Sequence, residues 1–405
     1  MKKIKLALSF ITIICIIMPV SIADDYLEEN HESVVVNADV SNMDFQILSR
    51  HVAVYERNSK TFLFEKASDE QCAMASTTKI MTCTLILENC NLDDTVIVSQ
   101  KAANTGGSHL GLITDSTISV KDLLYGLMLC SGNDAAIALA EHCSGSVERF
   151  AELMNNKALQ LGLSSTHFVT PHGLDNAGHY TTAHDFAILT DYALCNPQFM
   201  QIVGTKSYTV TINNSPKTVT NTNELLGVIP EVYGVKTGYT SQAGRCLITA
   251  AKQDNLDIIV IVFGADTKNI RTNDSANLIN YTLSTYTVIN AKELILAKYN
   301  DYITHILPYT NIEKMSQPLQ PQLDESFTEY YAIKKDDQDK IEVSLDDYDL
   351  KAPIKKDQPV AKITVNLNNH PIISTNIRSQ TLITSTTPKQ YLYHFLTHYK
   401  QYFKA

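Results

Sequence analysis

The chain has 405 residues, which is long enough for two domains with separate cores. Hydrophobic residues make up 44% and charged residues 19%, an ordinary globular composition that argues against general disorder. The formal net charge of -10 argues against a nucleic-acid partner, because phosphates require a basic surface. The sequence shows no zinc-type cysteine or histidine spacing and no glycine-rich phosphate loop, so we expect neither a metal nor a cofactor.

Residues 1–23 have the layout of a secretory signal peptide. Three lysines precede an apolar run from Leu6 to Val20, and small residues stand at the cleavage spacing before Asp24. An uncleaved membrane anchor is the alternative, since the run approaches spanning length. We therefore expect an exported, extracytoplasmic protein. Residues 24–46 are polar and acidic, and we expect a loosely held leader there.

The first chemical motif follows a predicted hairpin. Two β-rich runs, 51–55 and 61–64, flank a short turn. A helix is then expected to begin at or just before Ser76, because cap-type residues lead into an apolar run. Lys79 would lie one helical turn from Ser76. A serine nucleophile needs an adjacent base, and a lysine serves as one when burial or positive charge lowers its pKa.

Helices are predicted beyond the first motif. Ser119 with Asp122 forms a capping box. The helix that it starts ends just before Ser131-Gly132-Asn133, which places this second motif on a tight loop. Further helices are expected over 134–143, 146–161 and 182–195.

After residue 200 the hydrophobic period becomes that of strands. A second hairpin is predicted over 207–212 and 217–220, followed by strands over 234–238, 245–251 and 257–263 and by a closing helix over 273–296. Strands at both ends of a helical middle predict an α+β catalytic domain over residues 47–296. In that domain, helices flank one antiparallel sheet, and the all-helical middle forms a second lobe.

The remainder changes in character. Residues 297–384 are predicted to form a small all-β domain, with strands over 330–333, 341–345, 360–367 and 372–377. Residues 385–405 are amphipathic, with aromatic and aliphatic residues at helical spacing. We expect peripheral membrane contact through 389–404, because lysines accompany that apolar face. A terminal helix docked on the protein is the alternative.

The order and spacing of three motifs along the chain indicate a protein class. Ser76-x-x-Lys79 comes first, Ser131-x-Asn133 begins 55 residues beyond Ser76, and Lys236-Thr237-Gly238 begins 103 residues beyond Asn133. This is the signature order of penicillin-binding proteins and serine β-lactamases. The sequence around these motifs resembles the low-molecular-weight penicillin-binding proteins that act as D-alanyl-D-alanine carboxypeptidases. The segments that carry the resemblance are 106–108, 122–124, 131–136, 171–175, 221–223 and 234–240.

The resemblance runs from about residue 51 to residue 264, and more faintly through 351–356. It implies a β-lactamase/transpeptidase-like catalytic domain followed by a β-rich domain. It also implies two partners, the stem peptide of peptidoglycan and β-lactam antibiotics. Acyl-transfer chemistry then assigns the catalytic roles: Ser76 attacks the carbonyl between two terminal D-alanines and Lys79 takes its proton. Ser131 relays a proton to the leaving D-alanine.

The remaining motif residues are assigned to substrate binding. The Asn133 amide would hold the substrate and orient the catalytic lysine. Lys236 and Thr237 would bind the terminal carboxylate, and Gly238 would let the strand edge approach the peptide closely. The resemblance implies an oxyanion hole made by the backbone N–H groups of the nucleophile and of Tyr239.

Competing functions stay in view. A D,D-endopeptidase that cuts peptidoglycan crosslinks uses the same residues, so that alternative remains open. A class A β-lactamase would carry Asp in place of Gly132 and a Glu-x-x-Leu-Asn segment before Lys236, and neither is present. A non-enzymatic wall-binding protein on this fold would be expected to lose a catalytic residue, and none is lost.

The cysteine count suggests no disulfide framework. Eight cysteines are present, and removal of residues 1–23 takes away Cys15. The remaining odd number means that at least one thiol stays free or pairs elsewhere. Most lie in apolar stretches, where cysteine behaves as a small hydrophobe.

Overall fold

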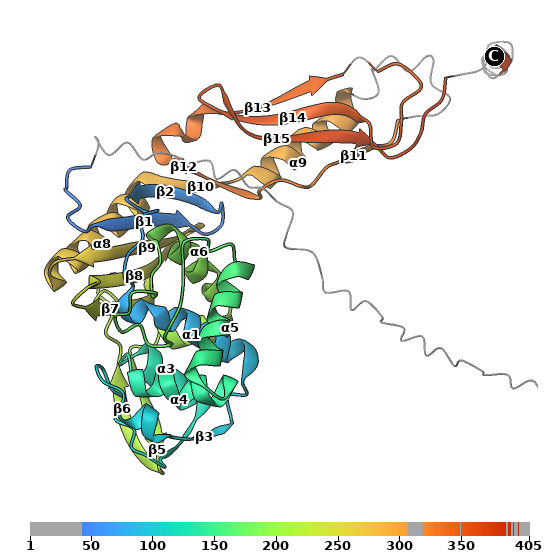
Figure 1. Ribbon diagram of the computed structural model, residues 1–405. Helices are drawn as coiled ribbons and strands as arrows, with labels where there is room; N and C mark the ends of the chain where they lie inside the picture. Colours follow the sequence, from blue (N-terminus) through green and yellow to red (C-terminus); the bar gives the residue numbers. More distant parts are fainter. Residues whose placement is uncertain are drawn as a thin grey trace, which may run out of the picture. The chain divides into compact units, whose positions relative to one another are not determined.

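A computed structural model describes residues 43–306, 319–348 and 350–385, together with residues 388, 389, 392 and 396 (Figure 1). The predicted signal peptide and most of the predicted leader lie outside the described residues, as does nearly all of the amphipathic segment 385–405. Within the described residues, no helix is both long and apolar enough to span a bilayer.

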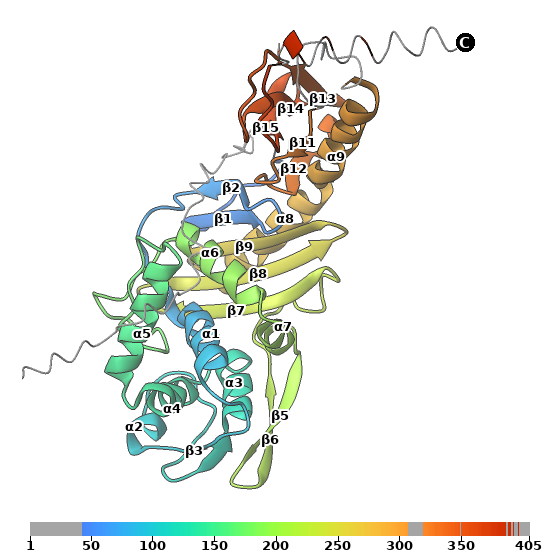
Figure 2. The same cartoon turned by 90° about the vertical axis from the view of Figure 1, so that its right-hand side faces the viewer.

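An antiparallel sheet organises the catalytic domain. Within the described residues it has five strands in the order β2-β1-β9-β8-β7, so the N-terminal hairpin adds to three consecutive strands from much later in the chain (Figure 2). The predicted hairpin and the three later strands are confirmed, each longer than expected. Their bounds are β1 His51–Glu56, β2 Thr61–Lys66, β7 Val232–Thr240, β8 Gly244–Gln253 and β9 Leu256–Ala265.

Strand β9 shows why this sheet carries helices on both faces. All of its residues are buried, and alternate side chains enter different cores because strand residues point to opposite faces. Ile259, Ile261 and Phe263 pack into the core shared with the helical lobe. Ile258 and Val260 pack into the core that includes helix α8 (Lys268–Thr285).

The predicted second lobe lies between β2 and β7 in the chain, but the prediction that it is all-helical is wrong, because two short strands, Thr95–Ile97 and Thr117–Ser119, pair within it. The lobe begins with a 3₁₀ turn, η2 (Ala75–Thr78), which continues into α1 (Lys79–Asn89). Strand β3 (Thr95–Ile97) pairs antiparallel with β4 (Thr117–Ser119), and β5 (Ser207–Ile212) forms a short hairpin with β6 (Ser215–Thr220). The other elements are α2 Gln100–Ala103, α3 Val120–Met128, α4 Asn133–Ser144, α5 Val147–Gln160, α6 Ala183–Leu194 and α7 Pro197–Val203.

The helix caps are mostly as predicted. The side chains of Ser119, Ser146 and Thr182 each accept a hydrogen bond from the third backbone N–H beyond them. In the predicted capping box, the Ser119 side chain caps the helix but the Asp122 side chain does not complete the box. The Asp122 carboxylate accepts from the backbone N–H of Thr211 at 2.9 Å, so it ties α3 to strand β5.

The predicted helix over 273–296 is wrong as a continuous element. Helix α8 (Lys268–Thr285) ends inside this range. Strand β10 (Tyr286–Asn290) follows it, and helix α9 (Ala291–Asp301) comes next. Strand β10 pairs antiparallel with β12 (Tyr330–Lys334). The β-branched and aromatic residues 286–289 favour a strand once such a partner is present.

The C-terminal strands are confirmed. The described part of this region holds a four-stranded antiparallel sheet in the order β11-β15-β14-β13. Ala291 and Ile295 of α9 pack into the core of this sheet, so the expected boundary at 296/297 falls inside a helix and the region is not all-β. The remaining elements are η3 Tyr302–Ile306, β11 Pro321–Leu323, η5 Lys335–Lys340, β13 Ile341–Asp347, β14 Pro359–Leu367 and β15 His370–Ser379.

Candidate active site

A chain of hydrogen bonds holds the backbone next to Ser76 in place. Ala75, which precedes Ser76, has a φ of 48°, and its carbonyl accepts from Thr78 Oγ1 at 2.8 Å. That hydroxyl lies 2.8 Å from His179 Nε2, and His179 Nδ1 accepts from the backbone N–H of Val169. Burial lowers the pKa of His179 to about 4. The neutral ring therefore carries its proton on Nε2 and donates it to Thr78.

Lys79 makes three polar contacts while fully buried. Its Nζ lies 2.9 Å from Ser76 Oγ, 2.7 Å from Asn133 Oδ1 and 2.7 Å from the backbone carbonyl of His172. A neutral amine has two N–H groups and one lone pair. The two carbonyl oxygens only accept, so the N–H groups go to them and the lone pair faces the Ser76 hydroxyl. This arrangement directs the serine proton to Lys79.

The surroundings of Lys79 favour its neutral form. Burial lowers the pKa of Lys79 well below its usual range, and the nearby positive charge of Lys236 lowers it further. The carboxylate of Asp134 acts in the opposite direction. A lysine of lowered pKa is the base that the serine nucleophile needs.

The second motif orients the lysine through Asn133. Its amide is fixed, because Nδ2 donates to the Gly106 carbonyl at 2.7 Å and so turns Oδ1 toward Lys79. Its backbone N–H also donates to the Ser108 carbonyl. The buried Asp134 carboxylate then accepts from the N–H groups of residues 110, 111 and 112, at 2.8, 2.8 and 3.0 Å. Residues 106–112 are thus fastened to the start of α4.

Ser131 lies just before α4 with a φ of 62°. Its Oγ is buried and has no hydrogen-bond partner among the described residues. Buried hydroxyls normally have a partner, so an orphan one in a motif is suited to a substrate or a water. The structure does not bond Ser131 to Lys79, and the relay role stays a prediction.

The third motif lies on β7, beside the nucleophile. An ideal Cβ at Gly238 would come within 3.1 Å of the Ser76 backbone nitrogen and of the Ala75 side chain. Glycine is therefore needed for the strand to pass this close to η2. Tyr239, the next residue, has a half-exposed ring with the Arg245 guanidinium 3.7 Å from its centroid.

Lys236 and Thr237, which are consecutive residues of β7, make different polar contacts. Lys236 is buried, and burial lowers its pKa to about 7; its Nζ donates to the Thr237 carbonyl at 3.0 Å. Thr237 Oγ1 lies 2.6 Å from Thr222 Oγ1. Consecutive residues of β7 thus supply an amine whose pKa is lowered to about 7 and a hydroxyl that is paired with Thr222, and this set suits a carboxylate.

Sequence reasoning missed several contributors. Thr222 and His172 lie in segments singled out by resemblance, but no contact was predicted for either. His172 serves through its backbone carbonyl, and its ring accepts from the Leu174 N–H at 3.1 Å. No pattern of residue types marks a backbone acceptor. Among the described residues, no cluster of His, Cys, Asp and Glu could hold a metal ion.

The antiparallel sheet, the helical lobe and the three motifs that meet at Ser76 define an active-site serine hydrolase of the penicillin-binding type. Residues 36–267 match the peptidase family S11, described as D-alanyl-D-alanine carboxypeptidase. That match covers more than half of the chain, and the chain belongs to this family of serine-type carboxypeptidases. The resemblance predicted from the motifs is confirmed.

Individual relatives agree with this assignment. The chain is 39% identical to D-alanyl-D-alanine carboxypeptidase DacF of Bacillus subtilis over 59% of its own length and 63% of that relative. It is 31% identical to DacA of Haemophilus influenzae over 82% of its own length and 84% of that relative.

Solved structures confirm the predicted fold class. Penicillin binding protein 5 from Haemophilus influenzae superposes with a TM-score of 0.67 at 28% identity, over 84% of this chain and 98% of that one. The Streptomyces K15 DD-transpeptidase superposes with a TM-score of 0.56 at 33% identity, over 58% of this chain and 97% of that one.

Proposed function

We propose that this protein removes the terminal D-alanine from the stem pentapeptides of peptidoglycan through an acyl-enzyme on Ser76, and that penicillin acylates the same residue. One observation carries the proposal. Lys79 has two carbonyl acceptors for its N–H groups, so its lone pair faces Ser76 Oγ at 2.9 Å.

Acylation follows from that geometry. The Ser76 proton passes to Lys79 as Oγ attacks the carbonyl carbon between the two D-alanines. The oxyanion that forms is assigned to the backbone N–H groups of Ser76 and Tyr239, and a donor of this kind is worth about 10²–10³ in rate. The proton reaches the leaving D-alanine nitrogen through the orphan hydroxyl of Ser131. Water then attacks the ester, Lys79 accepts the proton of that water, and the proton passes to Ser76 Oγ as the ester bond breaks.

Recognition of a free C-terminus is assigned to β7. Protonated Lys236 and the hydroxyl of Thr237 would bind the terminal carboxylate, with Thr222 fixing the orientation of that hydroxyl. The Asn133 amide would hold the scissile peptide. This carboxylate site suits the carboxypeptidase reaction, since a stem pentapeptide ends in a free carboxylate beside the bond that is cut.

We also propose export by the predicted signal peptide, action outside the cytoplasm, and peripheral membrane contact through 389–404.

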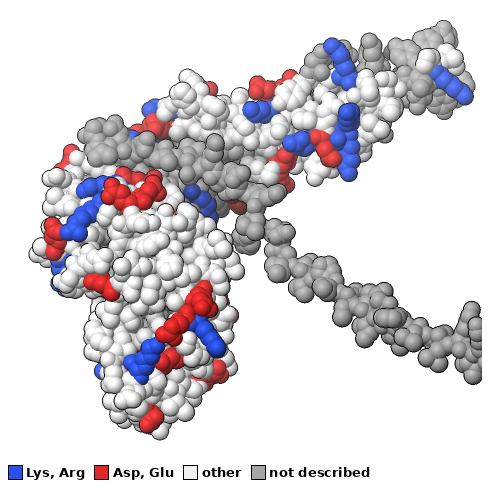
Figure 3. Space-filling view, in the orientation of Figure 1, with Lys and Arg blue, Asp and Glu red and all other residues white. Residues whose placement is uncertain are grey.

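The charge distribution supports the absence of a nucleic-acid partner. On the face in Figure 3, basic and acidic side chains of the described residues are interspersed and form no continuous basic surface.

Mass spectrometry of a pentapeptide muropeptide incubated with the purified protein tests the function. We expect loss of one D-alanine with the unchanged protein and none with Ser76→Ala. Labelled penicillin should attach stably to the unchanged protein only. Attachment to the Ser76→Ala protein, or an unaltered pentapeptide, would overturn the proposal.

A further inference from the structure

The peptide unit that joins Ala75 to Ser76 is held from two sides. Ala75 has a φ of 48°, a left-handed conformation that a residue with a Cβ rarely adopts without support. An ideal Cβ at Gly173 would come within 1.8 Å of the Ala75 carbonyl oxygen. One at Gly238 of β7 would come within 3.1 Å of the Ser76 nitrogen. The carbonyl of this peptide unit therefore lies against the loop that contains Gly173, and its nitrogen lies against β7.

The direction of the Ser76 N–H depends on the Ala75 carbonyl. A trans peptide unit is planar and its N–H points away from its C=O, so a contact that fixes the carbonyl also fixes the N–H. None of the described residues accepts a hydrogen bond from this N–H. It is thus available to an oxyanion, and its usefulness there depends on how firmly its direction is held.

Three hydrogen bonds in series end at the Ala75 carbonyl. The Val169 backbone N–H donates to His179 Nδ1 at 2.9 Å, so the proton of the neutral ring is on Nε2. Nε2 donates to Thr78 Oγ1 at 2.8 Å. The hydroxyl proton of Thr78 is then left for the Ala75 carbonyl, which is 2.8 Å away. Hydrogen bonds that point the same way polarise one another, so each bond strengthens the next.

The imidazole of His179 is fixed in place by its surroundings. The two residues after it, Tyr180 and Thr181, form β-bridges with His167 and Cys72. The His179 side chain is buried, with 4% of the residue exposed. A ring that is held on both its backbone and its Nδ1 side can orient the group that it contacts through Nε2.

We propose that His179 is a positioning residue for acyl transfer: through Thr78 it fixes the Ala75–Ser76 peptide unit and so orients the N–H of that unit toward the oxyanion. The inference rests on the proposed acylation of Ser76, which it deepens. His179 does not touch the reacting atoms, and it acts on them from a position 101 residues beyond Thr78 in the chain.

Asparagine and glutamine separate the two ring nitrogens of His179. The shorter Asn side chain can place its amide near Nδ1 and keep an acceptor for Val169, but it does not reach Thr78. The longer Gln side chain can place its NH₂ near Nε2 and keep the donor to Thr78, but it leaves the Val169 N–H without its acceptor. If closing the loop were the whole role of His179, His179→Gln would be the more damaging variant. The positioning role predicts the opposite order.

The first measurement is the rate of acylation by penicillin. We expect His179→Asn and Thr78→Val each to lower it by about ten- to a hundredfold, since a displaced donor loses part of the factor of about 10²–10³ that one oxyanion donor supplies. His179→Gln should recover most of that loss. The double variant His179→Asn/Thr78→Val should be no slower than Thr78→Val alone, because both residues act through one contact.

The second measurement is the infrared band of the ester carbonyl in the trapped penicilloyl-enzyme. A carbonyl that accepts hydrogen bonds has a lower stretching frequency, so weaker donation from Ser76 N–H should move the band to higher wavenumber. We expect that shift in His179→Asn and Thr78→Val, and a smaller one in His179→Gln. A loss of stability alone would not move the band.

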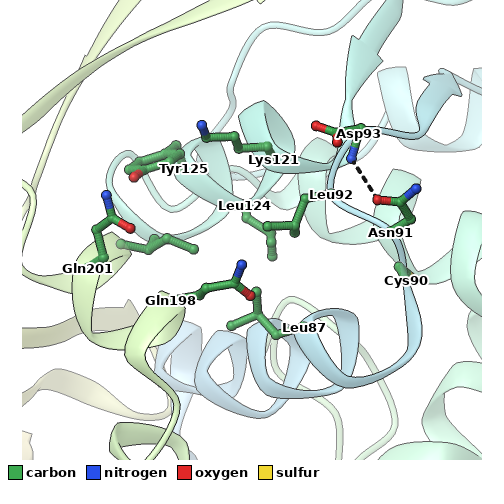
Figure 4. Close-up of a pocket in the computed structure, with 11 residues that line it drawn as sticks. Leu87, Cys90, Asn91, Leu92, Asp93, Lys121, Leu124, Tyr125, Gln198 and Gln201 are labelled. Atoms are coloured by element: carbon green, nitrogen blue, oxygen red, sulfur yellow. Dashed lines mark hydrogen bonds between the residues drawn. The ribbon is translucent and has the colours of Figure 1, made fainter.

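Thr84→Val is the matched control. Thr84 is also a buried threonine, and its hydroxyl donates to the Ile80 carbonyl at 2.8 Å. It lies one helical turn before Leu87, which lines a pocket of about 440 Å³ between α1, α3 and α7 (Figure 4). None of the motif residues lines that pocket. Thr84→Val should lower the thermal midpoint, since a buried hydrogen bond is lost, and leave both the acylation rate and the ester band unchanged.

Three results would each overturn the inference: an unmutated acylation rate in folded His179→Asn, equal losses in the Asn and Gln variants, or an ester band that does not move. If His179→Asn does not fold, Thr78→Val decides the question by the same rate and band, since it keeps the imidazole. Absence of acylation in the unmutated protein would overturn the proposed function, and this inference with it. Equal acylation of every variant would overturn the positioning role alone.

Discussion

Lys79 Nζ lies 2.7 Å from Asn133 Oδ1, so the base of the first motif and the amide of the second are one hydrogen-bonded unit. Since the Asn133 amide is fixed by Gly106, the lysine is oriented by a residue 54 positions away in the chain. The lone pair that faces Ser76 is a product of this long-range contact.

Lys79→Arg tests the base. A guanidinium stays protonated at any pH that the protein survives, so it cannot take the serine proton. We expect penicillin acylation to fall by about a hundredfold or more, with the far-ultraviolet circular dichroism unchanged. Acylation near the unmutated rate in a folded variant would show that the base lies elsewhere.

Asp134→Asn tests the charge beside the lysine. The Asp134 carboxylate raises the pKa of Lys79, so its loss should lower that pKa and move the acidic limb of the acylation rate to lower pH. The same change weakens the acceptor for residues 110–112, and the rate should fall about tenfold, the value of one charge-assisted hydrogen bond. A lower rate with an unshifted acidic limb would leave Asp134 a purely structural residue.

Carboxylate recognition predicts a substrate preference. A pentapeptide with a free terminal carboxylate should be cleaved about ten- to a hundredfold faster than its amide, since a charge-assisted contact is worth about 1.5–3 kcal/mol. Thr237→Val should erase part of that preference and slow the amide little. Thr222→Val, which removes the partner hydroxyl, should act in the same direction. The measurement is kcat/KM for both substrates, and equal values in the unmutated protein would favour the endopeptidase alternative.

The pH profile should separate the two lysines. Neutral Lys79 is needed for acylation, so kcat/KM rises with pH through the lowered pKa of Lys79. Protonated Lys236 is needed for the carboxylate, so the value for the acid substrate should fall as pH rises through about 7. The amide substrate should lack that fall. An identical alkaline limb for acid and amide would remove Lys236 from carboxylate binding.

Gly238→Ala tests the approach of β7 to the nucleophile. The added Cβ would meet the Ser76 nitrogen and the Ala75 side chain at 3.1 Å, so strand and turn must separate by a few tenths of an ångström. We expect acylation to fall at least about tenfold, because a small misplacement is costly in a preorganised site. The thermal midpoint should change little, which separates this effect from unfolding. Unchanged acylation would mean that the fit is not required.

Local patterns were sufficient for much of the fold. Thr182 caps α6 as its sequence position predicts, and Ser76 lies in the 3₁₀ turn that leads into α1, although no side chain caps that start. The strands from β7 to β9 were placed because β-rich runs alternate with turn residues. The break between α8 and α9 was not predictable in this way, since β10 depends on pairing with β12, about forty residues later.

The active site likewise contains residues that could be predicted from the sequence and others that could not. The motif residues could be placed from sequence, because acyl transfer requires particular side chains at particular spacings. The carbonyls of His172 and Gly106 could not, since every residue offers that acceptor. The acceptor role of Asp134 could not be predicted either, although the residue lies in the segment 131–136. Its hold on residues 110–112 depends on where the chain folds back.

The nearness of the two buried lysines makes the site responsive to its own ligand. The positive charge of Lys236 lowers the pKa of Lys79, so a carboxylate that neutralises Lys236 must raise it. By thermodynamic linkage, a proton on Lys79 and an anion on Lys236 favour each other by the same factor. The substrate thereby strengthens the base that activates Ser76: the Lys79 amine is a weaker proton acceptor while the site is empty and a stronger one once the carboxylate has bound.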